Sequence, residues 1–199
     1  HINAGAAAVA AALLVGRRKL PGLQPNNVPY IVLGASILWF GWFGFNGGSA
    51  LASDDYAVNA MLVTQIAAGT AATTWGILSM ISSGKISAVG TATGAVAGLV
   101  AITPAAGAVN PMGALAIGFG AGLICYYSVE LIHKTKLDDA LDVFAVHGVG
   151  GLWGCIATGI FAIESIAGVK GLIQGEFDQV FIQIYTALGT LACSFVLTY

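Results

Sequence analysis

The 199-residue chain is 57% hydrophobic and only 8% charged, and its formal net charge at pH 7 is −2. A soluble domain usually carries about 25% charged residues, so this composition excludes an ordinary water-soluble globular protein and favours one that is embedded in lipid. The 28 glycines fall largely within apolar segments, where such abundance indicates closely packed helices rather than loops.

Seven apolar segments follow one another along the chain, and a transmembrane helix needs ~17–25 residues. The first segment is slightly short, and the other six are close to that length. They are too long and too uniformly apolar for the alternating strands of a membrane barrel. The first ends at a basic cluster followed by Pro21 and Gly22, which is typical of a helix terminus. The sequence therefore predicts an all-α, polytopic membrane helix bundle. Its expected spans are 1–15, 28–52, 57–82, 86–103, 111–129, 143–163 and 179–199.

Charges in the breaks between spans orient these helices. Successive spans alternate sides, so the breaks fall into two sets. Six of the seven basic residues lie in one set, which comprises 17–19, 83–85 and 134–142. Only Lys170 lies in the other set, which comprises 53–56, 104–110 and 164–178. By the positive-inside rule, the basic breaks are cytoplasmic in a multi-pass protein of the cytoplasmic (plasma) membrane, and the last helix runs inward.

Two histidines are the main titratable features at membrane depth. No Asp, Glu, Lys or Arg lies well within any span, whereas His1 begins the first span and His147 lies inside the sixth. A titratable ring in lipid is costly unless it faces protein or a pore. A neutral imidazole offers one donor and one acceptor, and it can pass a proton because its unperturbed pKa is near ~6.5. The two rings therefore either hydrogen-bond a neighbouring helix or line a polar path, and His133 fits a solvated position at the membrane edge.

An aromatic cluster occupies the outer half of the second span. Within it, Asn46 and Ser49 share a helical face with Trp42 and Phe45. Aromatic faces beside a hydroxyl attract a small cation through cation–π contact, which is worth roughly 0.5–2 kcal/mol. An interfacial aromatic belt accounts for the same residues equally well.

Other kinds of site find no support in the sequence. The three cysteines lie in apolar runs without a C-x-x-C pair, which predicts neither a disulfide framework nor a metal site. No P-loop, dinucleotide fingerprint or zinc-protease motif occurs, and no basic, aromatic-rich patch indicates a nucleic acid. We therefore expect no enzyme activity, no cofactor and no nucleic-acid partner.

Three stretches together resemble the ammonium transporter family (Amt/Mep/Rh), and its Amt branch in particular. They are HINAG at 1–5, WFGFNGGSA at 42–50 and DVFAVHGVGG at 142–151. AGLVAITP at 97–104 and TGIF at 158–161 also resemble the family pattern. The resemblance covers nearly the whole chain, with its motifs in order.

The resemblance implies an eleven-helix fold of two inverted five-helix repeats plus a last helix, assembled as a homotrimer. The chain would be one domain, 1–199, that covers about seven of the eleven helices: the end of the first repeat, all of the second and most of the last helix. It would lack the N-terminal helices and the C-terminal tail. Family members are often blocked by PII-type signal proteins at the cytoplasmic face, so such a partner is also implied.

The same motifs imply roles for individual residues. His1 and His147 resemble the paired pore histidines of the family. Phe45 resembles one of two stacked phenylalanines that gate the pore from outside, and Ser49 resembles the hydroxyl at the outer cation site. The path would be lined or supported by Trp42 and Asn46.

Three further residues are expected to support the site. Thr103 resembles a residue near the outer mouth, and Asp139 and Asp142 precede His147. Asp139 stands where the repeat counterpart of an acidic residue before the first histidine would lie. Counting at ~1.5 Å per residue, His1 lies about 24 Å from the basic end of its helix, but His147 lies only about 8 Å past Asp142. The resemblance puts both rings at one depth, which requires tilt or an inward-dipping start to the sixth span.

These features predict transport of ammonium or ammonia through a hydrophobic pore, with methylammonium as an analogue. The cation would be recruited outside by aromatic faces and a hydroxyl. It would lose its proton before passage, because a bare cation in a dry pore is costly. Two alternatives stay open: an ammonium sensor on the same fold, and a membrane redox protein with His1 and His147 as haem ligands.

Overall fold

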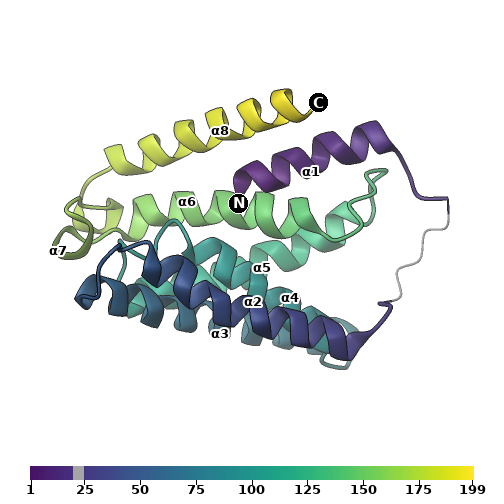
Figure 1. The fold of residues 1–199 in the computed structure, drawn as a ribbon, viewed down its shortest axis with the longest axis horizontal. Coiled ribbons are helices and arrows are strands. Elements are labelled where there is room, and N and C mark those ends of the chain that lie inside the picture. Colours follow the sequence, from purple (N-terminus) through teal and green to yellow (C-terminus); the bar gives the residue numbers. More distant parts are fainter. Residues whose placement is uncertain (20–24) are drawn as a thin grey trace.

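The computed structural model describes residues 1–19 and 25–199, so Pro21 and Gly22, expected to end the first span, lie outside the described residues. Within the described ranges every regular element is a helix, and the long helices run along the bundle with their connections at its two ends (Figure 1). In chain order the helices are α1 (Ile2–Val15), α2 (Val28–Gly48), α3 (Asp55–Ser83), α4 (Ala88–Ile102), α5 (Pro111–Ile132), η1 (Phe144–Val149), which continues directly into α6 (Gly150–Phe161), α7 (Glu164–Ala167), η2 (Leu172–Gln174) and α8 (Asp178–Thr198).

Several of these helices have the length and composition of membrane spans. Among the described residues, five helical stretches are long and apolar enough to cross a membrane: α2, α3, α5, η1 with α6, and α8. The apolar helices α1 and α4 are shorter, with 14 and 15 residues. In α2 and α8 only 6% of the most apolar stretch is buried, so these helices present a large apolar surface. The predicted all-α, polytopic membrane bundle is confirmed.

Polar caps set helix starts that the hydropathy pattern misplaced by two residues. Helix α3 begins earlier than predicted because the carboxylate of Asp54 accepts a hydrogen bond from the backbone N–H of Ala57, at 3.0 Å. Helix α4 begins later because the hydroxyl of Ser87 accepts one from the N–H of Gly90, also at 3.0 Å. Each side chain satisfies a backbone donor that the first helical turn leaves unpaired.

Glycines allow the helices to touch backbone to backbone. A Cβ added to Gly98 of α4 or to Gly118 of α5 would lie 2.5 Å from the same atom, the carbonyl oxygen of Ala67 in α3. A Cβ on Gly154 of α6 would lie 2.2 Å from the carbonyl oxygen of Ala101. A side chain at any of these positions would force the helices apart. The glycine content therefore reflects close helix packing, as the sequence indicated.

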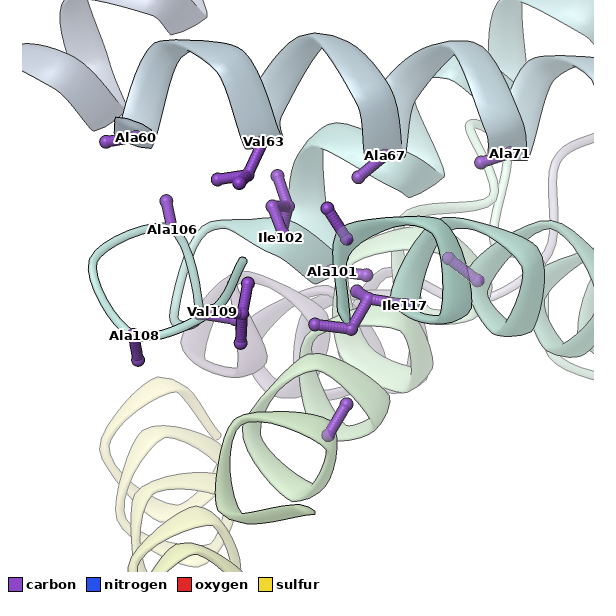
Figure 2. Close-up of a cluster of buried hydrophobic side chains, with 14 of the residues drawn as sticks. Ala60, Val63, Ala67, Ala71, Ala101, Ile102, Ala106, Ala108, Val109 and Ile117 are labelled. Atoms are coloured by element: carbon purple, nitrogen blue, oxygen red, sulfur yellow. The ribbon is translucent and has the colours of Figure 1, made fainter. Parts of the chain in front are cut away.

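The buried core is built mainly from alanines. In Figure 2, side chains of α3 face those of α4, of the turn that follows α4 and of α5. Small side chains suit a membrane bundle, because helices in lipid associate through close packing rather than through the burial of large apolar groups. The labelled members of this cluster are Ala60, Val63, Ala67, Ala71, Ala101, Ile102, Ala106, Ala108, Val109 and Ile117.

Candidate functional site

Two glycines bring α1 into contact with η1, and the contact brings two histidines together. A Cβ on Gly5 would lie 2.2 Å from the Cα of Gly148, so the two backbones touch. One turn before Gly5 is His1, and directly before Gly148 is His147. Their Nδ1 atoms are 3.3 Å apart and their ring centroids 5.4 Å apart. One Nδ1 must carry a proton and donate it, while the other accepts.

The residue count from Asp142 underestimated the depth of His147. The chain reaches the basic end of α1 earlier, at Asp138, whose carboxylate pairs with Arg18 at 2.7 Å. Residues 137–139 are neither helix nor turn, so they advance further per residue than a helix does. Asp142 then adopts a left-handed backbone with φ of 54°. This extended and left-handed approach precedes η1, in which His147 meets the ring of His1.

Helix α2 adds two aromatic rings beside this pair. The indole of Trp42 stacks on His1 with 5.2 Å between centroids and 23° between planes. The ring of Phe45 meets His1 edge-on at 6.2 Å and Trp42 edge-on at 5.7 Å. Trp42 is buried, and its Nε1 donates a hydrogen bond of 2.8 Å to Oγ1 of Thr103. That hydroxyl donates in turn to the carbonyl of Leu99, so Thr103 fixes the orientation of the indole.

A cavity of about 390 Å³ lies near the acidic breaks, at the end opposite the basic residues. Phe45, Asn46 and Ser49 all line it, as expected from their shared helical face. Phe45 is 54% exposed, so its ring face is accessible. The hydroxyl of Ser49 donates to the carbonyl of Phe45 at 2.6 Å, and its lone pairs remain free to accept. Trp42 does not line this cavity but lies deeper, against His1.

A second cavity, of about 460 Å³, reaches His1 from the side of α8. Thr103 and Pro104 line both cavities and so mark where the two approach each other. In the part of the chain that the structure describes, Nε2 of His1 is buried and has no hydrogen-bond partner. Buried polar atoms are seldom left unpaired. The ring therefore has a polar atom available to a small polar solute.

Asp139 stabilises the start of the helix that carries His147. Its two carboxylate oxygens accept hydrogen bonds from the backbone N–H groups of Val143, at 3.0 Å, and Phe144, at 2.7 Å. These donors would otherwise be unpaired, and a negative charge is favourable at a helix N-terminus. Asp139 thus acts on the helix backbone.

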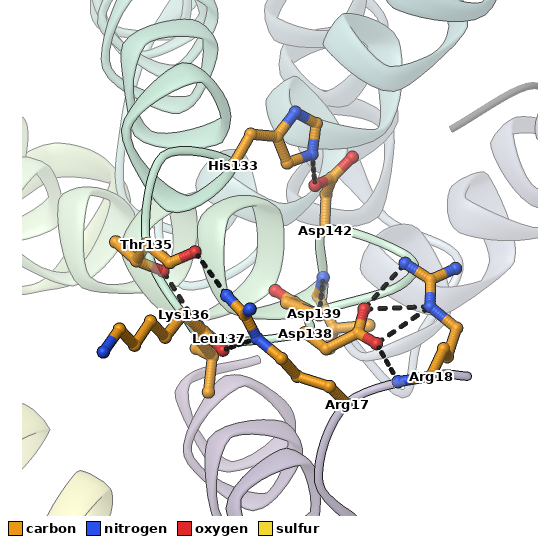
Figure 3. A network of polar contacts seen from close by, with 10 residues as sticks. Arg17, Arg18, His133, Thr135, Lys136, Leu137, Asp138, Asp139 and Asp142 are labelled. Atoms are coloured by element: carbon orange, nitrogen blue, oxygen red, sulfur yellow. Dashed lines mark hydrogen bonds and ion pairs between the residues drawn. The ribbon is translucent and has the colours of Figure 1, made fainter. Parts of the chain in front are cut away.

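A polar network ties the end of α1 to the segment before η1 (Figure 3). The guanidinium of Arg18 pairs with Asp138, and that of Arg17 donates to the carbonyls of Thr135 and Lys136. These contacts join residues that are about 120 positions apart in sequence. The network therefore fixes the segment before η1 relative to the basic end of α1.

The network also pairs His133 with Asp142. The Nε2 atom of His133 lies 2.7 Å from Oδ1 of Asp142 (Figure 3). Burial raises the pKa of the Asp142 carboxyl, and the neighbouring His133 opposes part of that rise. The opposite holds for Asp138, because its hydrogen bonds with Arg18 lower the pKa of that carboxyl. His133 lies outside the membrane-spanning helices, in agreement with the edge position expected for it.

One contact of the outer cavity was not foreseen. The Nδ2 of Asn46 donates a hydrogen bond of 2.8 Å to the buried hydroxyl of Thr64 in α3. A lone hydroxyl in an apolar helix usually bonds its own backbone, so the sequence offered no sign of a partner 18 residues away. Within residues 1–19 and 25–199, no group of three or more His, Cys, Asp and Glu side chains could hold a metal ion.

Fold and site together define a polytopic helical membrane protein in which a pair of histidines lies below an aromatic-lined cavity. The chain belongs to the ammonium transporter family, since the sequence profile of the Ammonium Transporter Family matches residues 1–199. It is 50% identical to the ammonium transporter of Aquifex aeolicus, and the match covers 100% of this chain and 47% of the relative. It is 44% identical to ammonium transporter Amt1 of Archaeoglobus fulgidus, with 100% and 51% covered.

Solved structures of the family have the same fold. Mep2 of Candida albicans matches with a TM-score of 0.92 and 38% identity, over 100% of this chain and 47% of that one. A structure named Sensor Amt Protein matches with a TM-score of 0.91 and 36% identity, over 100% and 51%. The resemblance to the family and its fold are thus confirmed. The chain spans about half the length of the relatives that it matches, and these are named transporters rather than enzymes.

Proposed function

We propose that the full-length protein transports ammonium or ammonia across a membrane. The observation that carries this proposal is the contact between His1 and His147, at 3.3 Å, beside Trp42 and below the cavity that Phe45 lines. Two neutral imidazoles in an apolar bundle provide polar contacts without a fixed charge. Membership of the ammonium transporter family supports the identity of the solute.

Recruitment would take place in the outer cavity. Ammonium carries only N–H donors, so it needs acceptors and electron-rich surfaces. The exposed ring of Phe45 offers an aromatic face, and Ser49 offers hydroxyl lone pairs because its proton is engaged by the carbonyl of Phe45. A cation–π contact of this kind contributes about 0.5–2 kcal/mol. That is enough to concentrate a small cation without trapping it.

Passage would take place at the histidine pair. Moving a charged ammonium ion past buried rings costs several kcal/mol, so the solute crosses more easily as ammonia. The unpaired Nε2 of His1 offers it a hydrogen bond, and the contact between the two Nδ1 atoms holds the rings together. An imidazole also exchanges a proton near neutral pH, so the pair can carry the proton separately.

The two alternative functions receive less support. Haem ligation by His1 and His147 would require a macrocycle between the two rings, but their Nδ1 atoms are in direct contact. A sensor built on the same fold is not favoured, because the curated relatives of this chain are named ammonium transporters.

Uptake of labelled methylammonium by cells that express the full-length protein tests the proposal. The paired change His1→Ala with His147→Ala should lower uptake by about 10²-fold or more, or abolish selectivity over potassium. His133→Gln is the matched control, since His133 lies outside the spans and glutamine can still donate to Asp142. Normal uptake and selectivity in the double variant would refute the proposed role of the pair.

The membrane, orientation and assembly of the protein are part of the same proposal. We place the basic end of the bundle in the cytoplasm, with the chain forming the end of the first inverted repeat, the second repeat and most of the last helix of a homotrimer in the cytoplasmic membrane. Labelling of single cysteines by an impermeant maleimide should modify Lys170→Cys in intact cells and Lys136→Cys only after the cells are opened. Cross-linking tests the trimer, and binding of a PII-type protein to inside-out vesicles tests that partner.

A further inference from the structure

The side chain of Asn46 is held in one orientation by Thr64. Thr64 is fully buried and Asn46 is 6% exposed. The hydroxyl of Thr64 lies 2.6 Å from the carbonyl oxygen of Ala60, to which it donates, and 2.8 Å from Nδ2 of Asn46. A hydroxyl has a single proton. Since that proton is used by Ala60, the hydroxyl can only accept from Asn46, so the amide must turn its NH₂ group toward α3.

This orientation turns the amide oxygen of Asn46 away from Thr64. Asn46 lines the outer cavity and Thr64 does not. Among the described residues, none donates a hydrogen bond to Oδ1 of Asn46, and this oxygen keeps some accessible surface. A carbonyl oxygen is a strong acceptor and is costly to leave unpaired. It is therefore available to a donor inside the cavity that Phe45 and Ser49 also line.

We propose that Thr64 is a positioning residue of the outer cavity, which acts by holding the Oδ1 atom of Asn46 toward a small cation with N–H donors. The inference rests on the proposed function and deepens it. Oδ1 of Asn46 and the lone pairs of Ser49 would accept the N–H groups of ammonium or methylammonium, while the ring of Phe45 faces its charge. A reversed amide would present two N–H donors to the cation and repel it.

The concentration dependence of methylammonium uptake by the full-length protein tests this inference. Thr64→Val keeps the shape but removes the hydroxyl, so the amide is no longer oriented. The concentration for half-maximal uptake should rise about 3–10-fold, as expected for one hydrogen bond. The maximal rate should stay within about twofold, because binding rather than the later step is weakened. Thr64→Ser keeps the hydroxyl and should behave like the wild type.

A double-mutant cycle separates positioning from a general effect on the fold. Asn46→Ala should itself raise the half-maximal concentration, and adding Thr64→Val to it should have no further effect, because Thr64 acts only through Asn46. Additive effects, or an unchanged half-maximal concentration in either single variant, would overturn the inference. Thr64→Ala removes the same hydroxyl if the valine variant does not fold, and Asn46→Ala alone still decides whether the acceptor matters. Absence of ammonium-competed uptake in the wild type would instead overturn the proposed function and this inference together.

Discussion

Gly5 and Gly148 touch at their backbones, because a Cβ added to Gly5 would stand 2.2 Å from the Cα of Gly148 and 2.5 Å from its nitrogen. Neither atom can move without shifting a whole helix. The rings of His1 and His147 meet only because α1 and η1 approach this closely. The glycine pair is therefore as necessary to the site as the histidines themselves.

Gly5→Ala should separate α1 from η1 and so disrupt the histidine pair. Overpacking of this kind costs about 1–3 kcal/mol of unfolding free energy, and methylammonium uptake should be largely lost. Gly34→Ala is the matched control, since a Cβ on Gly34 of α2 has open space around it and alanine favours a helix by up to about 1 kcal/mol. Thermal unfolding and uptake of the full-length protein check both. Equal stability and uptake in the two variants would contradict the assigned contact.

Thr103→Val should release the indole of Trp42 from its fixed position. The variant keeps the shape of the side chain but leaves the buried Nε1 without its acceptor, which costs about 1–3 kcal/mol. Because Trp42 stacks on His1, uptake should fall as well. Thr103→Ser retains the oxygen and should preserve both properties. Thermal unfolding with uptake measures the difference, and a valine variant as stable as the serine variant would count against the hydrogen bond.

Asp139→Ala should loosen the first turn of η1. It removes both acceptors for the N–H groups of Val143 and Phe144, and loss of a helix cap costs about 0.5–2 kcal/mol. Asp139→Asn keeps one acceptor and should lose less. Faster amide hydrogen exchange at residues 143–147 in the alanine variant is the direct readout. Unchanged exchange there would show that the cap does not hold the helix that carries His147.

Asp138 and Asp142 should contribute to stability with opposite dependence on pH. The raised pKa of Asp142 means that the folded protein binds the proton of this carboxyl more tightly than the unfolded chain does. The resulting contribution of Asp142 to stability is lost as the pH rises from 3.8 through the raised pKa. The lowered pKa of Asp138 gives a contribution that is lost as the pH falls through the folded value. Relative to wild type, Asp142→Asn should therefore gain in melting temperature with rising pH, and Asp138→Asn should lose. If the melting temperatures of both variants changed with pH in the same direction relative to wild type, this prediction would be contradicted.

The order and the membrane character of the helices could be predicted from the sequence, because length and hydropathy are local properties. The helix starts at Asp55 and Ala88 could not, since hydropathy ignores the polar caps that set them. Residue counting also failed to place His147 at the depth of His1. The rise per residue in the uncoiled segment 137–139 is not encoded in any periodic pattern, and only the family motifs indicated a shared depth.

The sequence predicted which residues belong to the candidate site better than it predicted the contacts between them. Their spacing predicted one helical face for Trp42, Phe45, Asn46 and Ser49. Three of the four line the outer cavity, whereas Trp42 lies deeper, against His1. The hydrogen bond of Asn46 to Thr64 could not be predicted, because a polar contact between two helices depends on their packing. The transport roles of these residues stay predictions.

The distance in sequence between His1 and His147, 146 positions, has a consequence in time. At ~5–20 residues per second, a ribosome makes the second ring roughly 7–30 s after the first. During that interval α1 holds an imidazole without its partner, and α8, whose Ser194 donates to the carbonyl of Asn3, has not yet been made. The histidine pair therefore forms only after the sixth span has been made, and a chain interrupted before His147 lacks one of the two rings.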